Sequence, residues 1–117
     1  MNKQSFGKQG EKIAIELLKN KGYQILETNF HKRSGEIDII AKSPEGQYVF
    51  IEVKTRHGHG FGYPEEAVNP QKIRKIFTTA QTWLAMKKIE TENYRIDVIA
   101  IEYEGDKPKI IHLENIF

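Results

Sequence analysis

The sequence predicts an α/β fold, in which one sheet is flanked by helices within a single domain of residues 1–117. Apolar residues recur at helical spacing in two segments, and five other segments have the apolar patterns of strands. The predicted order is helix, three strands, helix and two strands. The chain contains no internal repeat or low-complexity linker, and 117 residues are enough for one domain with its own core.

The first helix is expected over residues 6–21, with Ser5 as its N-cap and Gly22 just beyond its C-terminus. Glu11 is the unusual residue in this segment. It shares a helical face with the apolar residues three, four and seven positions later, which are Ala14, Ile15 and Leu18. A carboxylate beside a buried stripe is costly unless another group pairs with it. We therefore expect Glu11 to have a specific partner.

Three strands should follow, over residues 23–30, 36–41 and 48–55. The last two flank a turn-like segment, residues 43–46, and read as a hairpin that turns near Glu45. In that hairpin, residues whose numbers sum to about 90 lie opposite each other, so Asp38 faces Glu52 across the strands. Lys54 shares the face of Glu52, because side chains alternate along a strand.

The remaining elements are a loop, a helix and two strands. The string RHGHGFG, residues 56–62, reads as a loop. Asn69 and Pro70 form a good helix start, with Asn69 as the N-cap. Strands are expected over residues 94–101 and 109–113. Asp97 lies in the first of these beside Arg95, and we expect a structural ion pair or hydrogen bond there.

Asp38 and Glu52 are the candidate metal ligands, because carboxylate oxygens suit hard divalent cations such as Mg²⁺ or Mn²⁺. Lys54 would act on the attacking water or stabilise the transition state. The alternative is that these are ordinary strand charges joined by salt bridges. Glu11 would bind the metal or orient Lys54, or else pair with a neighbouring helix lysine. Glu36 shares the face of Asp38 and is either a further ligand or a solvated acid.

Composition narrows the class of protein. The chain has no cysteine, which excludes disulfides and thiolate zinc sites. It has no apolar run long enough to span a membrane and no apolar leader at its N-terminus, so a cytoplasmic protein without membrane contact is expected. Net charge is only +2, but residues 34–53 carry one Lys or Arg against four Asp or Glu, whereas residues 1–33 carry seven against three. An acidic centre between basic flanks suits a phosphodiester substrate; scattered solvated charge is the alternative.

Four residues are candidates for contact with nucleic acid: Arg56, Gln71, Lys72 and Lys75. The last three lie at the start of the second helix, where the helix dipole also favours phosphate. A solvated helix face is the alternative. The pair His57 and His59 is weak evidence for zinc, because two histidines in a loop lack a third partner.

An early helical Glu, an Asp on a hairpin strand and then Glu-x-Lys resemble the PD-(D/E)xK nuclease superfamily. The chain more closely resembles the bacterial YraN-like family, a group of predicted endonucleases similar to archaeal Holliday junction resolvases. The matching positions run through nearly the whole chain: Gly10-Glu11 with Ala14, Gly22-Tyr23, Asn29, Gly35-Glu36-Ile37-Asp38, Glu52-Val53-Lys54-Thr55-Arg56 and Asn115-Ile116-Phe117. One departure from the superfamily is that Ile37, and not proline, precedes Asp38.

This resemblance implies a restriction-endonuclease-like fold with a mixed central sheet. It also implies a Mg²⁺- or Mn²⁺-dependent endonuclease acting on DNA, and it favours branched DNA. The main-chain carbonyl of Val53 would be a further metal ligand. Cleavage of two strands of a junction would favour a symmetric homodimer. Two other functions stay open: a module of the same fold that binds nucleic acid without cutting it, and an interaction protein whose acidic cluster is a docking patch.

Overall fold

The computed structural model describes residues 3–57 and 69–116, with side chains for residues 7–56 and 69–116. It contains two helices and five strands: α1 (Lys3–Asn20), β1 (Gln24–Lys32), β2 (Gly35–Lys42), β3 (Tyr48–His57), α2 (Pro70–Met86), β4 (Tyr94–Glu104) and β5 (Lys107–Leu113). This is the predicted order of elements. Residues 58–62 of the predicted loop, including His59, lie outside the described residues, as does Phe117.

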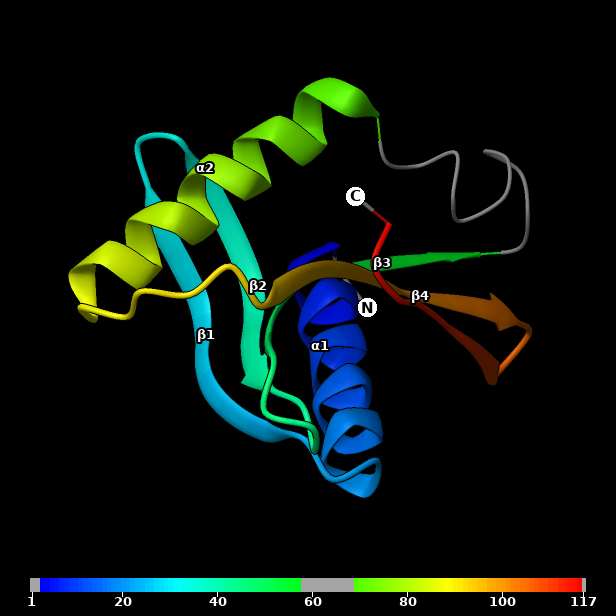
Figure 1. The fold of residues 1–117 in the computed structure, drawn as a ribbon. Helices are drawn as coiled ribbons and strands as arrows, with labels where there is room; N and C mark the ends of the chain where they lie inside the picture. Colours follow the sequence, from blue (N-terminus) through cyan, green and yellow to red (C-terminus); the bar gives the residue numbers. More distant parts are fainter. Residues whose placement is uncertain (1–2, 58–68, 117) are drawn as a thin grey trace.

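The five strands form one sheet in the order β1-β2-β3-β4-β5. Strands β3 and β4 are parallel, and every other neighbouring pair is antiparallel. Helix α2 makes the crossover between the parallel pair. Figure 1 shows α1 and α2 on opposite sides of this sheet. The prediction of an α/β fold with a mixed central sheet flanked by helices is confirmed.

Each helix covers its own apolar core. Helix α1 packs on one face of the sheet through Ala14 and Leu18, and α2 packs on the other through Ile76, Ala80 and Trp83. Strand β4 contributes buried residues to both cores, as expected for a central strand with a helix on each side. No helix within residues 3–57 and 69–116 combines the length and the apolar character needed to cross a bilayer.

The helix ends are partly as predicted. Helix α1 begins at Lys3, so the expectation that Ser5 is its N-cap is wrong, because the helix continues past that residue toward the N-terminus. At the other end, Gly22 has a φ of 87° and donates its N–H to the carbonyl of Lys19, which is the predicted C-terminal motif. Asn69 caps α2 as predicted, accepting the N–H of Lys72 at 2.8 Å.

Gly10 lets α1 lie unusually close to β3. A Cβ atom at this position would lie 2.1 Å from Oγ1 of Thr55, far inside van der Waals contact. Only a residue without a side chain allows this approach, which sets the next residue, Glu11, in the turn of α1 that packs on the sheet. Glu11 is half-buried in this position.

Gly10→Ala is expected to lower the free energy of unfolding by about 1–3 kcal/mol, the usual cost of overpacking. Gly7→Ala is the matched control, because Gly7 lies in the same helix and a Cβ there meets nothing within 4 Å. The control should be stabilising by about 0.5–1 kcal/mol, since alanine is the better helix former. Urea denaturation measures both changes. Equal effects of the two substitutions would show that the close contact at Gly10 is absent.

Candidate functional site

The hairpin of β2 and β3 has the predicted register, with Ile39 opposite Ile51 and Lys42 opposite Tyr48. The recorded pairing stops at Ile39, one residue before Asp38. There the N–H of Val53 donates to Oδ2 of Asp38 at 2.8 Å. The Asp38 carboxylate thus takes the position of a backbone carbonyl as the acceptor for the Val53 N–H, at the point where the two strands separate. The separation leaves space between β2 and β3 beside Asp38.

A cleft with a volume of about 370 Å³ lies at this position, between the two strands and the first turns of α2. It brings together three carboxylates of the strands and the polar residues at the start of the helix. The residues that line it are Gly35, Glu36, Asp38, Glu52, Asn69, Gln71, Lys72, Lys75 and Ile76. The structure therefore gathers six of the residues considered as ligands or as nucleic-acid contacts: Glu36, Asp38, Glu52, Gln71, Lys72 and Lys75.

The charge of Asp38 is disfavoured by its burial and by the neighbouring carboxylates. Burial raises the pKa of Asp38 from its ordinary value of 3.8 to about 6. The hydrogen bond from the Val53 N–H opposes this rise, and the negative charges of Glu52, Glu11 and Glu36 add to it. The three glutamates therefore lie near enough to disfavour a charged Asp38. A divalent cation among these carboxylates would relieve that repulsion.

Glu52 has one occupied oxygen and one buried oxygen without a partner. Its side chain is 13% exposed, and Oε1 accepts Nζ of Lys54 at 3.2 Å and Nζ of Lys72 at 2.5 Å. The other oxygen, Oε2, is buried and has no hydrogen-bond donor among the described residues. Leaving a charged oxygen buried and unsatisfied is costly. Such an oxygen beside a second carboxylate fits a hard cation as the missing partner.

Lys54 and Lys72 meet at the same carboxylate oxygen although they come from β3 and α2. Burial lowers the pKa of Lys54, and the neighbouring Lys72 lowers it further, whereas Glu52 acts in the opposite direction. Lys54 and Glu52 share a strand face as predicted, and their salt bridge is the contact that the sequence offered as the alternative to a catalytic role for Lys54. It did not predict that Lys72 reaches Glu52, because that contact depends on how the crossover helix is placed.

Glu11 has a specific partner, as expected, but this partner is Asn29 and not a lysine of the same helix. Nδ2 of Asn29 donates to Oε1 of Glu11 at 2.8 Å. Asn29 lies in β1 and has a φ of 53°, a left-handed conformation in the middle of a strand. Asn29 belongs to the family pattern in the sequence, but no role was predicted for it. The signal available was an asparagine, the residue type that tolerates this conformation, inside a strand.

Arg56, predicted to contact phosphate, is placed elsewhere. It forms an ion pair with Glu102 of the neighbouring parallel strand at 2.9 Å, and the two side chains are 11% and 1% exposed. A buried carboxylate requires a cationic partner, and Arg56 supplies it. Arg56 is not among the residues that line the cleft. The main-chain N–H of Val53 is at the site, and its carbonyl remains a predicted ligand.

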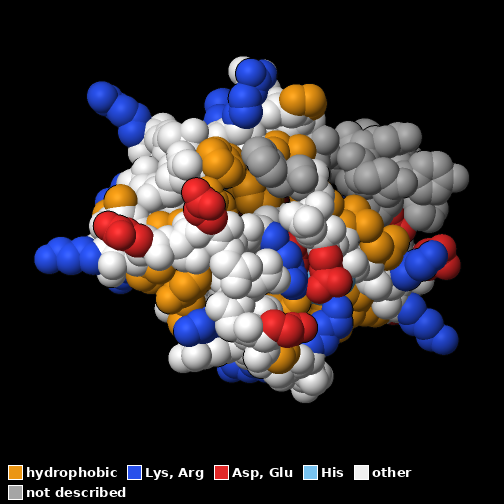
Figure 2. Space-filling view, viewed as in Figure 1, with side chains coloured by type: hydrophobic (Ala, Val, Ile, Leu, Met, Phe, Trp, Pro, Cys, Tyr) orange, Lys and Arg blue, Asp and Glu red, His pale blue; other side chains and the backbone are white. Residues whose placement is uncertain are grey.

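Figure 2 shows basic side chains interspersed with acidic ones on the face seen in Figure 1, with no broad surface of one sign. The positive charge at the cleft comes from its own wall, where Lys72 and Lys75 project from the first turns of α2.

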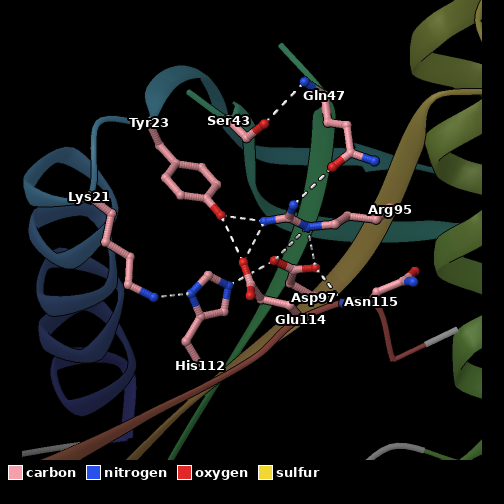
Figure 3. A network of polar contacts seen from close by, with 9 residues as sticks. All are labelled: Lys21, Tyr23, Ser43, Gln47, Arg95, Asp97, His112, Glu114 and Asn115. Carbon is pink, nitrogen blue, oxygen red and sulfur yellow. Dashed lines mark hydrogen bonds and ion pairs between the residues drawn. The ribbon is translucent and has the colours of Figure 1, made fainter. Parts of the chain in front are cut away.

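A second polar cluster surrounds Asp97, on the other face of the sheet (Figure 3). Ligand atoms of Asp97, His112 and Glu114 lie within 4.8 Å of one another, close enough to hold a metal ion. Nε of Arg95, however, donates to both oxygens of Asp97, at 3.1 and 3.3 Å. Nε2 of His112 lies 2.7 Å from the same carboxylate, and the N–H of Asn115 donates to it at 2.9 Å.

Burial acts to raise the pKa of Asp97, but the hydrogen bonds from His112, Asn115 and Arg95 lower it below its usual value. Asp97 is therefore a charged and fully bonded group. The cluster joins the C-terminal segment to β4, and Arg95 also contacts Glu114 and Tyr23, the residue just before β1. The predicted structural ion pair between Arg95 and Asp97 is confirmed.

Comparison with known proteins gives consistent family matches. The model of the uncharacterised protein family UPF0102 matches residues 10–101. A UPF0102 protein of Persephonella marina is 45% identical over 111 residues, covering 95% of this chain and 91% of the relative. A UPF0102 protein of Alkaliphilus oremlandii is 46% identical over 119 residues and is covered completely, as is this chain.

Two solved structures show a weaker likeness. A chain in the EndoMS–dsDNA2 complex is 12% identical, with a TM-score of 0.44 over 72% of this chain and 32% of that one. Pyrococcus furiosus SfsA in complex with Ca²⁺ is 15% identical, with a TM-score of 0.37 over 97% of this chain and 64% of that one. This chain thus spans about a third of the first protein and somewhat under two thirds of the second.

Proposed function

This chain belongs to the UPF0102 family, and we propose that it is a divalent-metal-dependent endonuclease that hydrolyses phosphodiester bonds of DNA. The observation that carries this proposal is the buried Oε2 of Glu52, which has no donor among the described residues and lies in a cleft with Asp38. Structural carboxylates usually have their oxygens bonded, as Asp97 does on the other face of the sheet. The unsatisfied Oε2 of Glu52, in the same cleft as the Asp38 carboxylate, is better explained as a ligand of a divalent cation.

Asp38 and Glu52 would hold Mg²⁺ or Mn²⁺, with Glu11 and the carbonyl of Val53 completing the protein's share of the ligands. These are all oxygen donors, which hard cations of this class prefer. When bound, such a cation lowers the pKa of a water molecule and neutralises charge on phosphate oxygens. The hydrogen bond from the Val53 N–H keeps Asp38 in one orientation, with Oδ2 bonded.

Lys54 is placed to stabilise the negative charge that develops on the phosphate during hydrolysis. Its Nζ is held 3.2 Å from Oε1 of Glu52, so the ammonium is fixed beside the proposed ligands before a substrate binds. Fixed charge in a partly buried site stabilises a transition state strongly, because no reorganisation is needed during the reaction. Burial and the neighbouring Lys72 also lower the pKa of Lys54, which eases proton exchange at Nζ.

The start of α2 would bind the phosphate backbone of the substrate. Gln71, Lys72 and Lys75 line the cleft on the side opposite the carboxylates of β2 and β3. Their positive charges and the N-terminal dipole of α2 favour phosphate at this wall. Branched DNA such as a four-way junction is the first substrate to test, following the family resemblance of the motifs.

Glu52→Gln is expected to weaken Mn²⁺ binding by at least about 100-fold, because even partners that only orient metal ligands contribute 10- to 100-fold. The amide keeps the size of the side chain but removes its charge and replaces one acceptor oxygen with a donor. Isothermal titration with Mn²⁺ measures the change. Glu104→Gln is the control, since Glu104 is an exposed carboxylate at the far end of β4. Equal Mn²⁺ affinity in the wild type and in Glu52→Gln would remove Glu52 from the site.

A further inference from the structure

Asn29 lies in β1 but has a left-handed backbone conformation, which differs from the extended conformation of a strand. It lies between two regular β1–β2 pairs, Thr28 with Ile39 and Phe30 with Ile37, yet its φ is 53°. Positive φ is uncommon for residues other than glycine, and asparagine is among the few that adopt it. Such conformations persist where the surrounding structure imposes them, and they concentrate at functional sites.

The register places Asn29 beside the proposed metal ligands. The intervening position of β2, between Ile37 and Ile39, is that of Asp38. Asn29 is thus the β1 residue at the level of Asp38, where β2 also separates from β3. Lys88 and Asn115, which also have positive φ among the described non-glycine residues, lie outside the strands. The left-handed residue in β1 therefore coincides with the candidate site.

The side chain of Asn29 holds the carboxylate of Glu11. Nδ2 lies 2.8 Å from Oε1, a good length for a hydrogen bond to a charged acceptor. Glu11 reaches this point from α1, on a helix that Gly10 allows to approach Thr55 closely. A glutamate side chain otherwise has several accessible rotamers. The amide of Asn29 selects one of them and occupies one oxygen, which orients the carboxylate relative to the sheet.

We infer that Asn29 is a positioning residue for Glu11: its left-handed backbone directs the amide at Oε1 and thereby holds the third carboxylate toward Asp38 for divalent-metal binding. This inference rests on the proposed function, because it assigns Glu11 to the same metal site. Asparagine combines the two required properties, a tolerance of positive φ and a neutral hydrogen-bond donor. Glycine has the first property without the second, and alanine has neither.

That difference defines the experiment, which is a titration of the metal-free protein with Mn²⁺ by calorimetry. Asn29→Gly keeps the backbone accessible but removes the amide, and it should weaken Mn²⁺ affinity by about 10-fold, the lower range for a group that orients a ligand. Its melting temperature should stay close to that of the wild type. Asn115→Gly is the matched control, because Asn115 has a φ of 52° but lies at the Asp97 cluster. This control should leave Mn²⁺ affinity unchanged.

A double-mutant cycle with Glu11→Ala separates positioning from a general effect on the fold. If Asn29 acts through Glu11, Asn29→Gly should have no further effect on Mn²⁺ affinity once Glu11 is alanine. An equal loss in both backgrounds, or no loss in either, would overturn the inference while leaving the proposed metal site intact. A wild type that binds no Mn²⁺ would instead refute the proposed function, and the role of Asn29 with it.

Discussion

Lys54→Ala is expected to reduce DNA cleavage by about 10²- to 10³-fold, the usual cost of losing one fixed group that stabilises transition-state charge. The ammonium is not a metal ligand, so Mn²⁺ affinity should fall by much less than the rate. The structure supports this division of roles, because Nζ of Lys54 contacts Oε1 of Glu52 and leaves Oε2 for a cation. Single-turnover cleavage in Mg²⁺ and calorimetry with Mn²⁺ measure the two quantities separately.

Lys107→Ala is the control for that substitution, since Lys107 is an exposed strand lysine at the start of β5. It should cleave at the wild-type rate. Wild-type turnover by Lys54→Ala would contradict the catalytic role of Lys54. A loss of Mn²⁺ binding as large as the loss of rate would show that Lys54 maintains the metal site and does not act on the transition state.

Asp38→Asn is expected to stabilise the metal-free protein at pH 8 by about 2 kcal/mol, which for a chain of this size raises the melting temperature by roughly 6–10 °C. Burial raises the pKa of Asp38 to about 6 in the folded protein, from the ordinary value of 3.8 that applies to the unfolded chain. The folded protein therefore binds this proton more tightly than the unfolded chain does. Stability of the wild type therefore falls as pH rises from about 4 through 6, and is lower by up to about 3 kcal/mol above that range. Asparagine avoids this loss and keeps an oxygen for the Val53 N–H.

The pH dependence and the effect of metal provide the controls for Asp38→Asn. Near pH 4 the two proteins should differ little, because Asp38 is then protonated in the folded wild type. Saturating Mg²⁺ at pH 8 should stabilise the wild type by about 2.7 kcal/mol at 100 times its Kd, and the variant much less. A metal-free variant that melts below the wild type at pH 8, with no Mg²⁺ shift in either protein, would show that Asp38 is structural.

Much of the site could be predicted because it depends on local patterns. Alternation along two short strands and a turn at residues 43–46 fix the hairpin register, and Asp38 and Glu52 come directly after its last pair, Ile39 with Ile51. In the structure this turn is closed by Ser43 and Gly46, and Gly46 has a φ of 91°. Helical spacing placed Glu11 on the buried face of α1. These inferences each involve residues within one element or one hairpin.

The contacts that could not be predicted depend on packing between distant elements. Arg56 meets Glu102 because the two residues are partners in the parallel register of β3 and β4, which is set across the α2 crossover. Lys72 reaches Glu52 because of where α2 begins relative to β3. The bond from Asn29 to Glu11 requires both a left-handed residue in β1 and the close approach of α1. No local pattern in the sequence determines these geometries.

The most direct test of the central claim is DNA cleavage by the wild type and by Asp38→Asn, measured on a four-way junction and on linear duplex with Mg²⁺ or with EDTA. The proposed site predicts that the wild type cuts at least one of these substrates in Mg²⁺ and neither of them in EDTA. The Asp38→Asn variant should cut neither substrate, in Mg²⁺ or in EDTA. Binding of DNA without cleavage by the wild type in Mg²⁺ and in Mn²⁺ would contradict the endonuclease and favour a binding module. Equal cleavage by Asp38→Asn would place the active site elsewhere in the chain.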